Sequence, residues 1–180
     1  MATIEDIQQI FSTEERMRLL REILNSEQEI NAINKKAGVN KGLASIYVRK
    51  LISLGVLKKN NGIFLDLNSP MTRTMKILMN VFSLDFEMPK DINIEGIGVY
   101  GSYAKGTNTS DSDIDIWIKS AKQPDEEKIA KFNSDLRRKL GNVKLLILTE
   151  DRIERLKKDD PVFYYSLLYG SIILKGDNIE

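Results

Sequence analysis

The sequence contains no cysteine and no histidine. Without cysteine the chain has no disulfides and no zinc-thiolate sites, and without histidine it has no imidazole to serve as a base or a metal ligand. Catalysis would therefore have to use carboxylates, hydroxyls, lysines or a hard cation such as Mg²⁺, which prefers oxygen ligands. These absences exclude cysteine and histidine nucleophiles and most transition-metal enzymes.

Long apolar runs are also absent. No stretch approaches the roughly 18 apolar residues that a helix needs to cross a bilayer. The first residues, MATIEDIQQIF, carry acids where a secretory signal would carry basic residues. We therefore expect no membrane association and a cytoplasmic location. The 180 residues are 42% hydrophobic and 29% charged, which suits one ordinary domain or two small ones.

Acidic residues are missing from one long segment. Between Ile30 and Leu65 there are seven lysines or arginines and no aspartate or glutamate, although the formal net charge of the chain is only +1. Because a carboxylate would repel a phosphate backbone, this composition favours contact with nucleic acid. The alternatives are a solvated basic face without a ligand and a surface that contacts another protein.

The first 68 residues have the pattern of helices followed by a hairpin. Ser12 with Glu15, and Ser26 with Glu29, have the spacing of capping boxes, which predicts helices that begin near residues 13 and 27. The second of these helices should end at Gly38. A third helix is predicted from about residue 41 to residue 54, after the turn GVN.

The segment VLKKNNGIFLDL then predicts two short strands around an Asn-Gly turn. Helix, helix, three-residue turn, helix and hairpin is the order of a winged helix-turn-helix. Through INKKAGVNKGLASIYVRKLISLGVLKK, residues 12 to 67 resemble the winged-helix family of prokaryotic transcription regulators.

This resemblance implies a DNA-binding surface. The helix after the turn would be the recognition helix in the major groove, and the hairpin would contact phosphate. Winged regulators often pair to contact two half-sites, so we also expect a homodimer. The side chains implied to face DNA are Asn40, Lys41, Ser45 and Arg49 on the helix and Lys58 and Lys59 on the hairpin.

The pattern of helices and a hairpin ends near residue 68, where we expect the boundary to a second domain. Ser69 and Pro70 should start a helix, because proline is tolerated at the first helical position. Its apolar stripe is expected to be core for the second half. The stripe consists of Met71, Met75, Leu78, Met79 and Phe82.

From Ile92 onward, strands alternate with helices. IGVY, DIDIWI, NVKLLILT and SIILKG predict strands, and helices are predicted from about residue 124 to 140 and from Asp160-Pro161 to Gly170. The expected fold class is mixed α/β. Residues 1–68 would form a winged helix-turn-helix, and residues 69–180 a mixed sheet with helices on one side.

Two acids occupy the second predicted strand. Residues two apart on a strand share a face, so Asp113 and Asp115 should point together while the isoleucines between and after them enter the core. Upstream, Gly101 and Ser102 follow the strand IGVY and should open a helix whose first N–H groups, with the serine hydroxyl, would hold phosphate oxygens. Gly106 lets the chain bend back. Phosphate donors and cation-binding carboxylates would then face one cleft.

Gly-Ser, ten residues, then Asp-x-Asp is the pattern of the nucleotidyltransferase superfamily that includes DNA polymerase β. GSYAKGTNTSDSDIDI most resembles its minimal nucleotidyltransferases, often encoded beside toxins, and the likeness covers residues 71 to 180. It implies that Asp113 and Asp115 hold Mg²⁺, with ATP as the expected nucleotide. Lys105 would be either a phosphate contact or a solvated lysine. The implied nucleotide-binding residues are Gly101, Ser102, Lys105, Gly106 and Ser112.

One residue departs from the family pattern. Active members place a third carboxylate on the next core strand, and in NVKLLILT the alternation puts Lys144 at that position. Glu150 lies six residues further on, roughly 20 Å along a strand, so it is too distant to replace the missing acid. A lysine there would act as a built-in cation in place of Mg²⁺.

Three functions remain open at this point. The first is a Mg-dependent nucleotidyltransferase that transfers a nucleoside monophosphate to an unknown acceptor and is targeted by the winged helix. The second is a DNA-binding transcriptional regulator with a catalytically degenerate, nucleotide-sensing nucleotidyltransferase domain, which Lys144 favours. The third is an antitoxin-like subunit that acts on a toxin-like protein partner.

Overall fold

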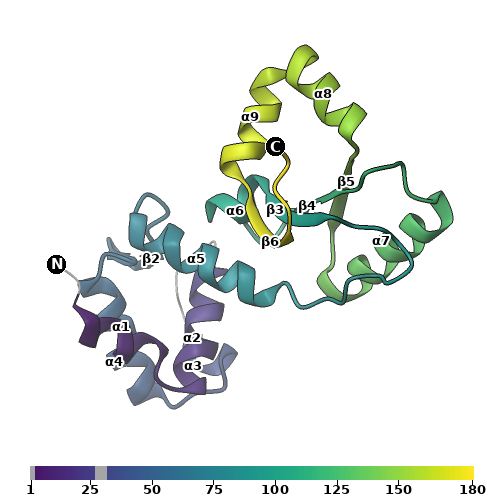
Figure 1. Cartoon of the computed structure of the whole chain (residues 1–180). Coiled ribbons are helices and arrows are strands. Elements are labelled where there is room, and N and C mark those ends of the chain that lie inside the picture. The colour runs from purple at the N-terminus through teal and green to yellow at the C-terminus, as the bar shows by residue number, and fades with distance from the viewer. Residues whose placement is uncertain (1–2, 27–31) are drawn as a thin grey trace. The chain divides into compact units, whose positions relative to one another are not determined.

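The computed structural model describes residues 3–26 and 32–180, and the chain divides into two compact units (Figure 1). We call Met1–Met79 the N-terminal unit and Asn80–Glu180 the C-terminal unit. The sequence places the boundary at residue 68, and the structure has it inside a helix that runs from Pro70 to Ser83. In the described part of the chain, no helix combines the length and the apolar composition needed to cross a bilayer.

Short helices and an antiparallel hairpin make up the N-terminal unit. The predicted third helix, the hairpin and the helix from Pro70 are confirmed, whereas the predicted helix start near residue 27 lies outside the described residues. The elements are α1 (Ile4–Phe11), α2 (Glu14–Leu24), α3 (Ile33–Lys36), α4 (Lys41–Ser53), β1 (Leu57–Lys59), β2 (Ile63–Leu65) and α5 (Pro70–Ser83).

Threonines cap the first two helices. At α1, which the sequence analysis missed, Thr3 and Asp6 form a capping box in which the Asp6 N–H donates to Thr3 Oγ1 at 3.2 Å. At α2 the cap is Thr13, whose hydroxyl accepts from the Arg16 N–H at 3.3 Å. The expectation that Ser12 caps this helix is therefore wrong by one residue. The Ser12 hydroxyl instead lies 2.8 Å from the Arg16 guanidinium.

Helix α4 is fixed to α1 by polar as well as apolar contacts. Tyr47, which is buried, donates its hydroxyl hydrogen bond to the Ile10 carbonyl at 3.2 Å. The amine of Lys50 pairs with the Asp6 carboxylate, and this hydrogen bond is the main reason that the pKa of Asp6 falls from 3.8 to about 2. The inner face of α4 therefore holds the helices together, which leaves its outer face exposed.

The methionine stripe of α5 belongs to the N-terminal core. Met75 is buried there, and Met71 and Met79 pack against the same cluster. The expectation that this stripe is core for the second half is wrong. Leu78 and Phe82, which the stripe also included, are 40% and 75% exposed.

The C-terminal unit contains a four-stranded mixed sheet with the strand order β5-β4-β3-β6. β3 pairs antiparallel with β4 and with β6, while β4 and β5 are parallel. The mixed α/β class and all four predicted strands are confirmed, and α8 was not predicted. The elements are β3 (Gly96–Tyr100), α6 (Gly101–Lys105), β4 (Ile114–Lys119), α7 (Glu126–Leu140), β5 (Val143–Leu148), α8 (Glu150–Asp159), α9 (Pro161–Gly170) and β6 (Ile172–Gly176).

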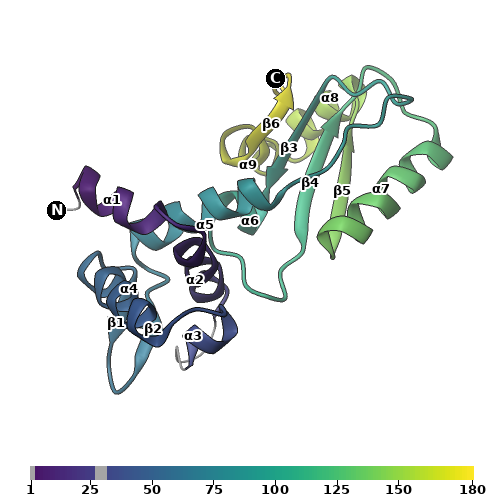
Figure 2. The same ribbon diagram turned by 90° about the horizontal axis from the view of Figure 1, so that it is seen from below.

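Helices cover both faces of this sheet, so the expectation of helices on one side is wrong. Ile116 and Ile118 of β4 pack with Leu136 of α7 on one face. Trp117 points to the opposite face, where it is fully buried against Leu167 of α9. Figure 2 shows α7 on one side of the sheet and α8 and α9 on the other. Both faces of β4 are therefore covered beyond its first residues.

Candidate functional site

The two predicted acids stand where β4 begins. Asp113 directly precedes the strand and Asp115 is its second residue. In the sheet register Asp115 lies between Tyr100 of β3 and Lys144 of β5. Ile114 is buried, as the alternation predicts. The fold thus brings the acids, the end of β3 and the start of β5 to one edge of the sheet.

The Lys144 amine binds one of these acids. Its Nζ lies 2.6 Å from Asp113 Oδ2, and the two side chains are 67% and 35% exposed. The hydrogen bond to Asp113, followed by the charge of Asp113, raises the pKa of the Lys144 amine. A basic side chain therefore faces the carboxylates from the strand position opposite Asp115.

Asp115 is the more tightly constrained acid. Burial raises the pKa of its carboxyl above 3.8; the Lys144 charge opposes this shift, and the Asp113 charge adds to it. A Cβ placed on Gly101 would lie 2.5 Å from Asp115 Oδ2, and Gly101 has a φ of +68°. The positive φ favours glycine at this position, and a Cβ there would force the Asp115 carboxylate to shift.

The predicted Gly-Ser turn opens the short helix α6. Ser102, which is half-buried, is the second residue of this helix. Gly106 ends it at a φ of 64°, and its N–H donates to the carbonyls of Ser102 and Tyr103, which confirms the predicted bend. Lys105 is exposed, and its Cε lies 3.9 Å from where a Cβ on Gly170 would be, at the end of α9. Of the two residues of the Gly-Ser turn, Gly101 lies directly against Asp115.

Ser112, predicted to bind nucleotide, closes a local turn. Its hydroxyl accepts from the Thr109 N–H at 2.9 Å, and the two hydroxyls lie 3.2 Å apart. This turn immediately precedes Asp113, so it fixes the backbone position of that acid. The bonded Ser112 oxygen therefore has a structural role in the loop between α6 and β4.

Two asparagines that the sequence analysis did not single out hold this loop in place. Asn80 of α5 donates to Asn108 Oδ1 at 2.8 Å and to the Tyr103 carbonyl at 2.9 Å. Asn80 and Asn108 are 9% and 4% exposed. Their positions, 28 residues apart, gave no sequence signal because the bond depends on tertiary packing.

Tyr100 is a third residue that sequence reasoning missed. Its ring packs edge-to-face against Phe163 of α9, with ring centroids 6.3 Å apart. Burial, followed by the charge of Asp115, raises the pKa of the Tyr100 hydroxyl. Tyr100 lies opposite Asp115 in the register of β3 and β4.

All six residues predicted to face DNA are exposed in the N-terminal unit. On α4 the Arg49 guanidinium lies 2.9 Å from the Ser45 hydroxyl, and Lys41 begins the helix. Asn40 is the cap of α4, since its Oδ1 accepts from the Gly42 N–H at 2.7 Å. The structure therefore gives Asn40 a local role besides the predicted one.

Most of the basic charge in the acid-free segment is not neutralised. Lys50 pairs with Asp6, and Lys58 lies 3.9 Å from Asp66. In the described ranges 3–26 and 32–180, the other five basic residues of this segment form no ion pair. They are Lys35, Lys36, Lys41, Arg49 and Lys59.

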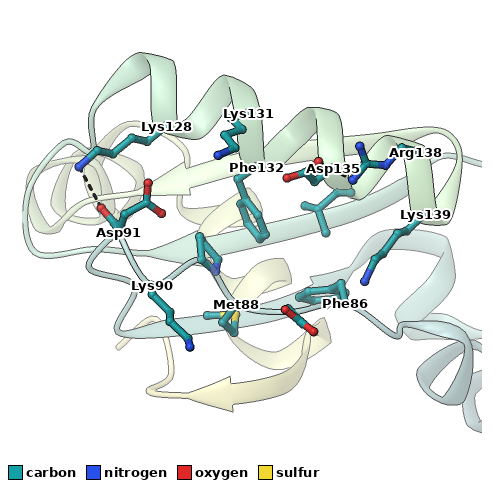
Figure 3. A pocket seen from close by; sticks show the side chains of 13 residues that line it. Phe86, Met88, Lys90, Asp91, Lys128, Lys131, Phe132, Asp135, Arg138 and Lys139 are labelled. Carbon is teal, nitrogen blue, oxygen red and sulfur yellow. Dashed lines mark hydrogen bonds and ion pairs between the residues drawn. The ribbon is translucent and has the colours of Figure 1, made fainter.

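A cavity of about 350 Å³ lies between α7 and the segment before β3 (Figure 3). Phe86 and Phe132 contribute apolar surface, with ring centroids 6.4 Å apart, and Lys128 donates to the Asp91 carbonyl at 3.2 Å. Neither Asp113 nor Asp115 lines this cavity. It lies on the side of the sheet that α7 covers, so it is separate from the two acids.

The metal-binding capacity of the site is limited to two acids. Among the residues that the structure describes, no group of three or more Asp, Glu, His or Cys side chains is placed to hold a metal ion. Mg²⁺ is usually bound by one or two carboxylates together with waters and substrate phosphates. The carboxylates of Asp113 and Asp115 therefore fit Mg²⁺ when a nucleotide supplies further oxygens.

Residues 86–179 match the family model described as Polymerase beta, Nucleotidyltransferase. The match spans just over half of the chain and includes Gly101, both acids and Lys144. The chain belongs to the polymerase beta nucleotidyltransferase family. The sequence-based resemblance of the second half to this superfamily is thereby confirmed, and the match does not extend to the N-terminal helices.

One solved structure similar to this nucleotidyltransferase is described as a toxin-antitoxin with AMP-PNP. The similarity covers 61% of the chain and 75% of that protein, with 22% sequence identity and a TM-score of 0.36. Similarity at this level supports no statement about function. No curated protein sequence matches the chain.

Proposed function

We propose that this nucleotidyltransferase transfers a nucleoside monophosphate from a nucleoside triphosphate, ATP first of all, to a hydroxyl acceptor. The acceptor oxygen forms a bond to the α-phosphorus and gives up its proton to solvent, the bond from that phosphorus to the bridging oxygen breaks, and pyrophosphate leaves. The observation that carries the proposal is the close approach of Asp115 to Gly101 at the end of the sheet where Asp113 leads into β4.

Different residues of the site would bind the phosphates and the cation. Gly101 and Ser102 would hold phosphate oxygens through the backbone N–H groups at the start of α6 and the Ser102 hydroxyl. Asp113 and Asp115 would hold Mg²⁺. When bound, Mg²⁺ neutralises charge on the triphosphate and polarises the α-phosphorus. Lys105, exposed on α6, would add a phosphate contact.

The ion pair of Lys144 and Asp113 is too weak to exclude this activity. Ion pairs at a protein surface are weak because water screens their charges, and the Lys144 side chain is 67% exposed. A triphosphate carries more negative charge than one carboxylate, so it attracts the amine more strongly. Binding of nucleotide and cation can therefore displace the lysine from Asp113.

The same ion pair favours a second function. If Lys144 keeps Asp113 occupied while nucleotide binds, the chain would bind nucleotide without turnover and act as a DNA-binding regulator. The N-terminal unit supports DNA binding because α4 presents Lys41 and Arg49 on its exposed face, in a segment without acids. A homodimer would place two such helices on two half-sites.

An assay with ATP labelled at the α-phosphate separates the two functions. We expect the full chain with Mg²⁺ to release pyrophosphate and to label an acceptor, which is sought in the chain itself, in total RNA and in total protein. Asp113→Asn combined with Asp115→Asn should abolish both signals, because the cation loses its carboxylates. The matched control, Asp111→Asn with Asp177→Asn, removes the same charge from exposed positions of the same unit.

The control variant should retain wild-type turnover. Nucleotide binding by the wild type without any labelled product would support the regulator instead of the enzyme. Turnover that persists in the Asp113 and Asp115 double variant would show that these two acids are not the catalytic pair.

A further inference from the structure

The side chain of Lys144 lies beside both acids at one end of the C-terminal sheet. Lys144 lies beside Asp115 in the parallel register of β4 and β5, and its Nζ contacts Asp113 at 2.6 Å. Its pairing with Asp113 takes one carboxylate oxygen that a cation would otherwise bind. A divalent cation and Lys144 therefore compete for the same ligand.

We propose that Lys144 is an exchangeable counter-ion that makes capture of a divalent cation conditional on nucleotide. Without nucleotide, the amine occupies Asp113. With nucleotide, the amine moves to the phosphates, and the two carboxylates become available to a cation that the phosphates also bind. This inference rests on the proposed function, because it requires nucleotide to bind beside Asp113 and Asp115.

Charge explains why the cation should not bind alone. Two carboxylates without Lys144 would attract a divalent cation from solution, whereas the lysine cancels one of their charges and occupies one of their oxygens. Mg²⁺ also needs more oxygen ligands than two aspartates supply. A triphosphate changes both conditions, since it offers the amine a more highly charged partner and the cation additional oxygens.

The exchange needs no rearrangement of the core. Lysine carries its charge on a flexible four-carbon stem, and the Lys144 side chain is 67% exposed. Its strand is anchored by its neighbour Val143, which is 1% exposed. Asp115 is held in the sheet, where β4 pairs with both β3 and β5. Only the lysine side chain has to move.

This mechanism predicts opposite effects of one substitution on two ligands. In Lys144→Ala, Mn²⁺ alone should bind more tightly, because its competitor is gone. The same variant should bind ATP without metal more weakly, because a phosphate contact is lost. Each effect should be about fivefold, the size expected when one exposed ion pair is removed. A lysine with a merely structural role would not produce this pair of changes.

Electron paramagnetic resonance of free Mn²⁺ measures the first effect and calorimetry with metal-free ATP the second, both on the full chain. We expect the wild type to bind Mn²⁺ weakly when no nucleotide is present and much more tightly when a non-hydrolysable ATP analogue is added. Lys144→Glu, which restores an acid, should bind Mn²⁺ alone more tightly than Lys144→Ala. Lys175→Ala and Lys175→Glu are the matched controls, since Lys175 is an exposed lysine on a strand of the same sheet.

Equal affinity of the wild type and Lys144→Ala for Mn²⁺ alone, with nucleotide still bound by both, would overturn the proposed role of Lys144. Absence of nucleotide binding by the wild type, with or without Mn²⁺, would instead overturn the proposed function. Lys144→Met retains most of the stem, so it should reproduce the effects of Lys144→Ala. Circular dichroism of each variant verifies that it is folded.

Discussion

At the scale of single residues, Gly101 has a backbone conformation that favours glycine and also lies directly against a proposed metal-binding acid. Its φ of +68° lies in the left-handed region, and the place of its missing Cβ is 2.5 Å from Asp115 Oδ2. A side chain at this position would have to displace the carboxylate. The arrangement of the site therefore depends on glycine at position 101 as well as on the two acids.

Gly101→Ala should lower the free energy of unfolding by about 1–2 kcal/mol through the backbone conformation alone. It should also weaken ATP binding tenfold or more, because the new Cβ displaces Asp115. The matched control is Gly38→Ala, since Gly38 has a φ of +63° and no atom within 4 Å of the added Cβ. Urea unfolding and titration with Mg-ATP measure the two effects.

Gly38→Ala should show the stability loss with unchanged ATP affinity. If Gly101→Ala also retains wild-type affinity for ATP, the contact between Gly101 and Asp115 does not shape the nucleotide site.

Spacing made some of these residues predictable. Asp113 and Asp115 follow from the period of a strand, and the same period placed Lys144 beside them on the next strand. Asn80 and Asn108 could not be predicted, because their hydrogen bond joins a helix to a loop through tertiary packing. The spacing of residues in the sequence therefore identified the charged side chains of the site, but not the two asparagines that hold the adjacent loop.

At the scale of elements, composition decided which helices were predictable. α7 was predicted because it ends at Gly141 and carries an apolar stripe. α8 was missed because Ile153 is its one buried residue in the described structure, so its charged sequence has little helical periodicity in apolar residues. Trp117 of β4 was also difficult to predict as a core residue, because it is buried on the strand face that carries the two acids.

Helix α5 shows a different limit of periodicity. Its stripe was recognised, yet Met75 packs in the N-terminal core. A period of 3.6 residues identifies an apolar face, but it does not say which core that face enters.

Helix α4 is the element on which DNA binding can be tested. Lys41→Ala with Arg49→Ala should weaken binding to the DNA upstream of the chain's own reading frame about tenfold or more, since two cationic contacts are removed. The logarithmic dependence of affinity on salt should become shallower by up to about 2. Gel shifts at several salt concentrations measure both quantities.

Lys131→Ala with Lys175→Ala, exposed lysines of the C-terminal unit, is the control for loss of charge. Equal weakening by both double variants would mean that the effect comes from net charge. In that case α4 would not be a recognition helix.

At the scale of the whole molecule, the proposed DNA binding and the proposed nucleotidyl transfer belong to two different compact units. The fall in acid content between residues 30 and 65 marked the first part in the sequence, and the alternation of strands and helices marked the second. The boundary itself was harder to predict, because α5 begins in the packing of one unit and ends in the other. The family match, over residues 86–179, lies entirely in the second unit.

The central claim is that Asp113 and Asp115 bind a nucleotide together with Mg²⁺, and calorimetric titration of Mg-ATP into the full chain tests it most directly. We predict equal heats for the wild type and for Asp111→Asn with Asp177→Asn, and no heat for Asp113→Asn with Asp115→Asn. The same heat from all three proteins, or heat from none of them, would contradict the account.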